Sequence, residues 1–401
     1  MKNYRNHTVA GVALLLAVLF FSSCSTGQAN VATQQQTLFA PAPGSPIAVG
    51  CGPGNVSIGD LNNDGKHDLV VACGEQRRLV VLLNTGSREG QFHASNPIPL
   101  PDPPGDMALG DVNGDKNLDL AIDSHDSYGV VLLLGDGKGG LALAPNSPIV
   151  MKDGQHPHTH GLGLADMNGD QKLDLVTANN ADNDISIAFG DGRGRFTRAP
   201  AAFAVGPSPY PFVVADVNND GRPDIVATAT ATGPLRAQQL PKSFALTLLL
   251  NDGRGGFRRS ELPLRTGQPW FVDAGDLNGD RKPDLVANHH DQSKLSVLLG
   301  DGAGHFSEAG GSPFDWGRSA FQVALADVNR DGRLDALAAT GEAVRILLGD
   351  GRGDFKPAPG SPFATGRGVW RLAVSDMNGD SKLDIITTNS DSRSIGLLMG
   401  Q

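Results

Sequence analysis

Short apolar runs separated by polar turn residues recur along the chain from residue 38 onwards. Val323–Ala326 and Ala336–Ala339 form one such pair of runs, with a polar, Asp-rich segment between them. A third run, Val344–Leu348, ends at a Gly-Asp-Gly turn, and Phe355 follows that turn. Apolar, β-rich runs bounded by Gly, Asp and Asn are typical of strands joined by tight hairpin turns. The pattern predicts a unit of four short strands.

The polar segment between the first two runs has a fixed sequence, Asp-x-Asn-x-Asp-x-x-x-Asp. Its copies begin at Asp60, Asp111, Asp166, Asp216, Asp276, Asp327 and Asp376, so that the spacings are 51, 55, 50, 60, 51 and 49 residues. Four-stranded repeats of this length are typical of the blades of a β-propeller. We therefore predict an all-β fold, a seven-bladed β-propeller of four-stranded blades over residues 37–401.

The two ends of this region complement each other. Residue 401 lies where the fourth strand of the seventh unit would begin, and Phe39–Pro46 closely copies Phe355–Pro362. We expect residues 38–48 to form the outer strand of the last blade, so that an N-terminal strand closes the ring and protects a sheet edge. The 52 Gly and 26 Pro residues of the 401-residue chain suit such a turn-rich fold.

The repeated loop offers hard oxygen ligands at positions 1, 3, 5 and 9, and a backbone carbonyl at position 7. Such ligands suit Ca²⁺, whereas zinc and copper prefer His or Cys. We predict up to seven Ca²⁺ ions, held by Asp60, Asn62, Asp64, Asp68; Asp111, Asn113, Asp115, Asp119; Asp166, Asn168, Asp170, Asp174; Asp216, Asn218, Asp220, Asp224; Asp276, Asn278, Asp280, Asp284; Asp327, Asn329, Asp331, Asp335; and Asp376, Asn378, Asp380, Asp384.

The loop has two other interpretations. An EF-hand requires a Glu at position 12 and flanking helices, but that position holds residues such as Val71 and Thr387, and strands flank the loop. Alternatively, the Asp and Asn residues only form turns, because they readily cap their own backbone. Seven Ca²⁺ ions would offset the formal charge of −10, which favours the metal interpretation.

The seven loops and their flanking strands resemble the FG-GAP or VCBS repeat family, which includes the propellers of integrin α subunits. The resemblance covers about residues 38–401. It implies that the calcium hairpins join the first and second strands of each blade on the lower face of the propeller. The regularity of the loops is closer to a bacterial member of the family than to an integrin subunit.

The N-terminus predicts an export signal over residues 1–23. Lys2 and Arg5 precede an apolar run that ends at Phe21, and this run is short for a membrane span. The segment before Cys24 resembles a bacterial lipobox, which implies lipidation of Cys24 and a flexible tether over residues 24–36. We expect an outer-membrane lipoprotein; the alternative is an ordinary secreted or periplasmic protein.

Cys51 and Cys73 remain after Cys24 is assigned to the lipid. Both lie at the upper ends of strands in the first blade, and an oxidising compartment would favour one disulfide between them. Two separately buried thiols are the alternative.

The upper face, opposite the loops, collects aromatic and histidine side chains. The candidate ligand-binding residues are His156, His158, His160, Tyr210, Trp270, Phe321 and Trp370, with Phe271, His125, Asp126, Asp182, His289, His290 and Asp291 nearby. Aromatic platforms beside polar groups suit sugar or peptide recognition. Alternatively, Trp270, Phe271 and Trp370 plug the central channel, and the segment His156–His160 holds a transition metal. The insertion Thr230–Ser243 is expected to overhang this face.

The predicted function is a non-enzymatic binding or adhesion module for a protein or carbohydrate, displayed on a cell envelope by its lipid anchor and monomeric. No nucleophile elbow, phosphate loop or paired-acid motif is visible, so no catalytic residue is assigned. The alternative is a calcium-dependent enzyme resembling polysaccharide lyases. Nucleic-acid binding is not expected, since no basic stripe with interleaved aromatics occurs.

Overall fold

The computed structural model describes residues 37–87, 89–155, 157–230 and 244–401. The chain divides into two units, Met1–Gln35 and Gln36–Gln401, of which the first lies outside the described residues. Every regular element in the described part of the second unit is a β-strand. The prediction of an all-β fold is therefore confirmed.

The strands occupy four positions in antiparallel sheets. The innermost strands are β3 (Pro53–Gly59), β8 (Met107–Gly110), β13 (Thr159–Ala165), β18 (Phe212–Ala215), β22 (Pro269–Gly275), β27 (Gln322–Ala326) and β31 (Phe363–Ser375). The second strands are β4 (Asp68–Cys73), β9 (Asp119–Ser124), β14 (Asp174–Asn179), β19 (Asp224–Ala227), β23 (Asp284–His289), β28 (Asp335–Ala339) and β32 (Asp384–Asn389). The third strands are β5 (Arg78–Asn84), β10 (Ser127–Gly135), β15 (Asp184–Gly190), β20 (Phe244–Asn251), β24 (Lys294–Gly300), β29 (Gly341–Gly349) and β33 (Ser394–Gly400).

The outer strand is usually split into two short pieces. These pairs are β6 (Phe92–Ala94) and β7 (Ile98–Pro99), β11 (Leu141–Leu143) and β12 (Ile149–Val150), β16 (Phe196–Arg198) and β17 (Phe203–Ala204), and β25 (Phe306–Glu308) and β26 (Phe314–Asp315). The strand β21 (Phe257–Leu264) is continuous, whereas β30 (Phe355–Pro357) is followed by the long β31, which pairs with both β29 and β32. This double pairing joins the last two repeats into one nine-stranded sheet.

The second strands form the centre of the hydrophobic core. Every residue of β4, β14 and β32 is buried, because neighbouring sheets pack on both faces of these strands. One cluster joins Val70 and Val81 of the first sheet to Leu120 and Leu133 of the next. This packing explains why the second and third strands are near-continuous apolar runs in the sequence.

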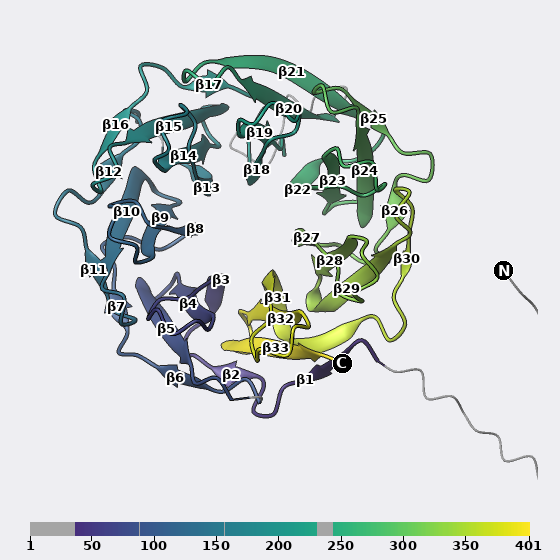
Figure 1. Ribbon diagram of the computed structural model, residues 1–401, viewed down its shortest axis with the longest axis horizontal. Coiled ribbons are helices and arrows are strands. Elements are labelled where there is room, and N and C mark those ends of the chain that lie inside the picture. The colour runs from purple at the N-terminus through teal and green to yellow at the C-terminus, as the bar shows by residue number, and fades with distance from the viewer. Residues whose placement is uncertain (1–36, 88, 156, 231–243) are drawn as a thin grey trace, which may run out of the picture. The chain divides into compact units, whose positions relative to one another are not determined.

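Figure 1 shows the sheets of the second unit side by side around a common centre, with the innermost strands nearest to it. Consecutive innermost strands contact each other from β3 to β31, and β31 in turn contacts β3. Hydrogen bonds connect several of these neighbours. Asn55 Nδ2 donates to Asp106 Oδ1 at 2.7 Å, and the Leu325 N–H donates to Asp273 Oδ2 at 2.9 Å.

The strands β1 (Phe39–Pro41) and β2 (Ile47–Ala48) occupy the outer position of the last sheet. Phe39 pairs with Gly400, and Ile47 pairs with Ile395, so both strands are antiparallel to β33. Residues 38–48, which we expected to form the outer strand of the last repeat, therefore contain two short strands in that position.

Candidate functional site

Each repeated loop joins an innermost strand to the second strand of its sheet. The last Asp of the loop is the first residue of the second strand in every repeat, and it is fully buried; these residues are Asp68, Asp119, Asp174, Asp224, Asp284, Asp335 and Asp384. In the last repeat, Asp384 Oδ2 accepts the N–H of Met377 at 2.8 Å, and Oδ1 accepts the N–H of Gly400 at 2.9 Å. The same two bonds recur in every repeat and tie the loop to the third strand.

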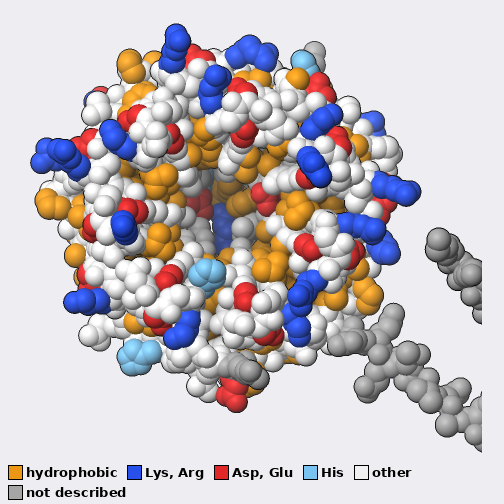
Figure 2. Space-filling view, viewed as in Figure 1, with side chains coloured by type: hydrophobic (Ala, Val, Ile, Leu, Met, Phe, Trp, Pro, Cys, Tyr) orange, Lys and Arg blue, Asp and Glu red, His pale blue; other side chains and the backbone are white. Residues whose placement is uncertain are grey.

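The other oxygens of the loop lie nearer the surface. Asp376 Oδ1 accepts the N–H of Gly379 at 2.7 Å, and Asn378 Oδ1 accepts the N–H of Asp380 at 2.9 Å. Such bonds are Asx turns, which hold the loop in a tight coil. The face drawn in Figure 2 carries basic side chains beside acidic ones around a central hollow.

The loop carboxylates lie close enough to repel one another. Burial, together with the negative charges of Asp380 and Asp376, raises the pKa of Asp384 to about 6, against the two backbone hydrogen bonds that lower it. The same causes raise the pKa of Asp174, Asp224 and Asp335 to about 6. A bound cation would remove this repulsion.

The donor set of each loop suits Ca²⁺, because every side-chain ligand is an oxygen. Part of the negative charge already has a partner: Lys66 Nζ lies 3.0 Å from Asp64 Oδ2, and Arg222 Nη1 lies 3.2 Å from Asp220 Oδ2. The three carboxylates of a loop do not converge within 4.8 Å, a limit that one histidine cluster alone meets among the described residues. A cation would draw the loop oxygens together.

The ends of the sheets that lie opposite the Asp-rich loops carry a continuous row of rings. We call this row the aromatic arc, and it consists of His160, Tyr210, Trp270, His290, Phe321 and Trp370. Successive ring centroids are 4.0, 4.7, 5.3, 4.6 and 4.4 Å apart, and the rings are tilted by 33° to 40° to one another. Five of the rings stand six residues before the first Asp of the loop in their repeat, and His290 directly follows the second strand β23. All six are partly exposed.

Arg371 lies beside the arc and is only 6% exposed. Its guanidinium stacks over Phe271 at 4.9 Å from the ring centroid, and Nη2 lies 3.4 Å from Asp106 Oδ1. Nη1 has no hydrogen-bond partner among the described residues. Asp123 is buried behind Asp106 and accepts the Asp106 N–H at 2.7 Å. Burial, followed by the charge of Asp106, raises the pKa of Asp123 well above its ordinary value.

These side chains line a pocket of about 180 Å³ whose walls include Asn55, Asp106, His160, Tyr210, Trp370 and Arg371. Burial, together with the nearby His158, His125 and Arg371, lowers the pKa of His160 to about 2, and burial also raises the pKa of Tyr210. At neutral pH the pocket therefore presents a neutral imidazole, a neutral phenol and one buried guanidinium, which lies beside Asp106. This combination suits a ligand with both an apolar face and an acceptor or acidic group.

The FG-GAP-like repeat pattern matches residues 60–122, 166–227, 276–338 and 327–387, which is more than half of the chain. The chain belongs to the FG-GAP-like repeat family. The matched segments contain all seven Asp-rich loops in full, from the loop that begins at Asp60 to the loop that begins at Asp376. No curated protein sequence matches this FG-GAP-like chain.

Solved structures show the fold of the FG-GAP-like chain. BBS1N in its complex with ARL6DN is similar with a TM-score of 0.59 at 14% identity, over 91% of this chain and 98% of that one. An Agrocybe aegerita lectin specific for non-reducing terminal N-acetylglucosamine has a TM-score of 0.52 at 21% identity, over 76% and 78%. Virginiamycin B lyase from Staphylococcus aureus has a TM-score of 0.51 at 13% identity, over 88% and 97%. At such identities the likeness is one of fold alone.

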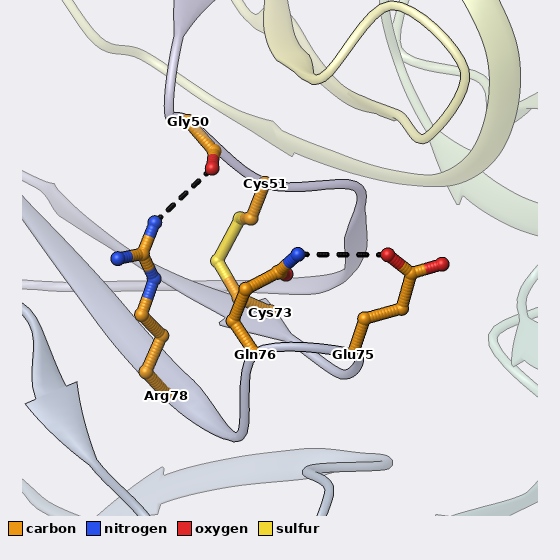
Figure 3. The surroundings of a disulfide bond; sticks show 6 residues. All are labelled: Gly50, Cys51, Cys73, Glu75, Gln76 and Arg78. Atoms are coloured by element: carbon orange, nitrogen blue, oxygen red, sulfur yellow. Dashed lines mark hydrogen bonds between the residues drawn. A yellow bond between two sulfur atoms is a disulfide. The ribbon is translucent and has the colours of Figure 1, made fainter.

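The first repeat contains a disulfide between Cys51 and Cys73, whose Cα atoms are 5.7 Å apart. Cys51 precedes β3 and Cys73 ends β4, so the bridge fastens the start of the innermost strand to the end of the second. Figure 3 shows Arg78 beside the bridge, where Nη2 donates to the Gly50 carbonyl at 3.1 Å. Cys24 lies outside the described residues.

The predicted ligand-binding residues of the FG-GAP-like chain are only partly brought together. His158, His160, Tyr210, Trp270, Phe321 and Trp370 lie on one face, whereas His156 and residues 231–243 lie outside the described residues. His289 was expected near this face, but its side chain is buried within the sheet, where Nε2 contacts Ser296 Oγ at 2.9 Å. Asp182 instead accepts the hydroxyl of Tyr128 at 2.6 Å.

Sequence reasoning missed Asn55, Asp106 and Arg371. Each stands five residues before the first Asp of the loop in its repeat, a position that Phe271 and Gln322 occupy in other repeats. A comparison of the repeats at this one position reveals the polar residues that meet at the pocket. Candidate membrane-spanning helices are absent from the described residues.

Proposed function

We propose that this FG-GAP-like chain is a calcium-binding, seven-bladed β-propeller that serves as a binding module for a carbohydrate or protein partner. The observation that carries the proposal is the aromatic arc beside the Arg371 pocket. Rings from five consecutive repeats contribute to the arc, so a ligand that lies across it would contact several repeats at once. Partly exposed rings with polar neighbours suit the apolar face of a sugar or an aromatic-rich peptide.

The closed, seven-bladed form is supported by the pairing of β1 and β2 with β33 and by the contact between β31 and β3. Both link the last repeat to the beginning of the folded region. A ring closed in this way leaves fewer free sheet edges, which would stabilise the face that carries the arc.

Calcium would act as a structural ion in this proposal. Its ligands would be the oxygens at positions 1, 3, 5 and 9 of each loop, at the sheet ends opposite the arc. The ion would neutralise the repelling carboxylates and hold the turn between the first two strands of each repeat. The partner site and the calcium sites are therefore distinct.

The proposed location is the bacterial cell envelope, with export by residues 1–23 and lipidation of Cys24. The basic start, the apolar run and the Phe21-Ser22-Ser23-Cys24 segment support it. An anchored module of this kind would display the propeller at the end of the tether over residues 24–36. Metabolic labelling with a palmitate analogue tests the anchor, because a Cys24→Ala chain would take up no label.

The polysaccharide lyase alternative is less well supported. A lyase needs a base at neutral pH, but His160 has a strongly lowered pKa and Tyr210 a raised one. The first is a weak base, and the second stays protonated. Incubation with uronic-acid polysaccharides should therefore give no rise in ultraviolet absorbance; a rise that Tyr210→Phe abolishes would establish the lyase instead.

Binding to an immobilised glycan panel and to a panel of envelope proteins tests the binding module. The purified chain should bind at least one probe, and Trp370→Ala should reduce that binding by about 1 to 3 kcal/mol, the usual cost of losing an interface aromatic. Leu143→Ala is the matched control, because Leu143 is 55% exposed on the outer strand β11, away from the arc. Equal loss in both variants, or no binding to any probe, would contradict the proposed site.

A further inference from the structure

Two histidines at the start of β13 point to the same side of their strand. His158 and His160 are two residues apart, and side chains at this spacing share a face of a strand. Their Nε2 atoms lie 3.1 Å apart. Both side chains are partly buried, so two imidazole nitrogens are held together at the rim of the pocket.

A third imidazole comes from the neighbouring repeat. His125 lies in the turn between β9 and β10, and its ring centroid is 3.9 Å from that of His158 and 5.0 Å from that of His160. One nitrogen of each of the three rings lies within 4.8 Å of the others, a convergence that no other group of three His, Cys, Asp or Glu side chains shows among the described residues.

The spacing is close to that of a metal site. Zn²⁺ binds imidazole nitrogen at about 2.0 to 2.1 Å in a tetrahedron, which places ligand nitrogens about 3.4 Å apart. The His158 and His160 nitrogens are already near this separation. His125 is on an exposed turn, so a small movement of its side chain would complete the set.

Metal-binding histidines usually donate the hydrogen of their second ring nitrogen to an acceptor such as a carboxylate, and His125 has a carboxylate in this position. His125 Nδ1 lies 2.9 Å from Asp126 Oδ1. A carboxylate that accepts the Nδ1 hydrogen leaves the lone pair of Nε2 free for a metal and orients the ring. The contact is independent of the nitrogen distances and favours the same conclusion.

We propose that His125, His158 and His160 form a binding site for one first-row transition metal ion, for which Zn²⁺ is the best fit. Neutral imidazole ligands suit zinc and copper, whereas Ca²⁺ prefers oxygen. His125 and His160 also line the pocket with Tyr210 and Arg371, so the fourth coordination position faces a space that a water molecule or a carboxylate could enter. This site is separate from the calcium loops and does not depend on the proposed function.

The test uses the exported chain without a polyhistidine tag, stripped with EDTA and reloaded with Ca²⁺ before Zn²⁺ is added. Isothermal titration should show one Zn²⁺ ion per chain, and Co²⁺ should give the visible absorption of a tetrahedral site. Asp126→Asn should weaken binding about tenfold, the lower end for loss of a residue that orients a metal ligand. His158→Ala and His160→Ala should weaken it further.

His305→Ala is the matched control, because His305 is an exposed histidine that contacts Asp301 at 2.8 Å. It should leave Zn²⁺ binding unchanged, and circular dichroism should show that every variant is folded. Absence of binding heat would overturn the site, as would unchanged affinity in His125→Ala. His156→Ala tests the neighbouring histidine: loss of binding in that variant, with retention in His125→Ala, would replace the proposed third ligand.

The open fourth position has its own readout. Added acetate should shift the absorption bands of the Co²⁺-loaded chain, because a carboxylate would replace the water on the metal. The Ca²⁺ content of the same samples is measured separately, so failure of the zinc site and failure of the calcium loops give different results. A Co²⁺-loaded chain with unchanged bands would overturn the open position.

Discussion

The hydroxyl of Ser45 accepts a hydrogen bond from the N–H of Leu397 at 2.9 Å, across 352 positions of sequence. Ser147, Ser312 and Ser361 accept the same bond from the third strands of their own repeats, at 2.9, 3.0 and 3.0 Å. In these repeats the serine that accepts the bond comes from the repeat's own outer segment. In the last repeat the serine is Ser45, which comes from the other end of the folded region.

Ser45→Ala should lower the free energy of unfolding by about 1 kcal/mol, because the strand N–H of Leu397 loses its acceptor. Ser361→Ala, which removes the equivalent bond within one repeat, should cost about the same. Urea unfolding of the folded region measures both. Deletion of residues 37–49 should cost more than either substitution, since Phe39 is 3% exposed and packs on Phe363 at 5.5 Å. A deletion without effect on the melting temperature would contradict ring closure by the N-terminal strand.

Asp384→Ala should destabilise the last repeat both with and without calcium. The substitution leaves the N–H groups of Met377 and Gly400 without acceptors, at a cost of about 2 to 5 kcal/mol. Asp380→Asn is the control, because Asp380 is 36% exposed and Asn keeps the oxygen that accepts the Lys382 N–H, so its loss of stability should arise in the calcium-bound form. EDTA should therefore remove the effect of Asp380→Asn but only part of the effect of Asp384→Ala.

Metal analysis of the dialysed chain accompanies that experiment. Five to seven Ca²⁺ ions per chain are expected, since each loop has the same four side-chain ligands. Two or fewer would mean that most loops are Asx turns closed by their own hydrogen bonds. In that case EDTA would not change the melting temperature of the unmodified chain.

The repeat could be predicted from the sequence because each of its signals is local. The Asp-rich loop, the Gly-Asp-Gly turn and the apolar runs recur at nearly constant spacing, and together they fix the strands and their order. The double role of Asp384 could not be predicted this way, because its second hydrogen bond reaches Gly400 on the third strand. Such a bond depends on how the second and third strands lie side by side, and the loop pattern describes a single segment of the chain.

The aromatic arc was predicted in part for a similar reason. Tyr210, Trp270 and Trp370 are large aromatic residues, each six residues before the first Asp of a loop, so their face follows from their distance to the loop. Arg371 and Asp106 are common residue types, and they are 265 positions apart in the sequence. Their importance becomes visible only in the structure, where Arg371 Nη2 lies 3.4 Å from Asp106 Oδ1. The structure adds His125, from a neighbouring repeat, beside His158 and His160, whereas His156 lies outside the described residues.

Removal of the disulfide should destabilise the first repeat. Replacement of both Cys51 and Cys73 by Ala frees a loop with a sequence separation of 22 residues, for which chain entropy predicts a loss of about 3 kcal/mol. Denaturant unfolding of the variant, compared with the disulfide-bonded parent chain, measures the loss, and the reduced parent chain should unfold as the variant does. Detection of two free thiols in the native, unreduced chain would contradict the bridge.

The pH dependence of stability should carry an opposite contribution from each of two aspartates. Asp273 lies on β22 and is partly buried, and burial raises its pKa. The hydrogen bonds that it accepts from the N–H groups of Leu325 and Ala274 lower the pKa by less. Asp301 lies in an exposed turn, where the N–H of Ala303 and the side chain of His305 lower its pKa to about 2.

A raised carboxyl pKa means that the folded state binds the proton more tightly than the unfolded state. The stability that Asp273 contributes is therefore present at low pH and is lost as the pH rises above the ordinary aspartate value of 3.8 and through its folded pKa. Asp301 has the opposite sign: its contribution is present above 3.8 and is lost as the pH falls towards about 2.

Unfolding of Asp273→Asn and Asp301→Asn is measured at pH values from 2 to 7, and the difference from the parent chain gives the contribution of each aspartate to stability. The parent should lose stability relative to Asp273→Asn as the pH rises, and gain stability relative to Asp301→Asn. Slopes of the same sign for both variants would show that burial does not control the charge of Asp273.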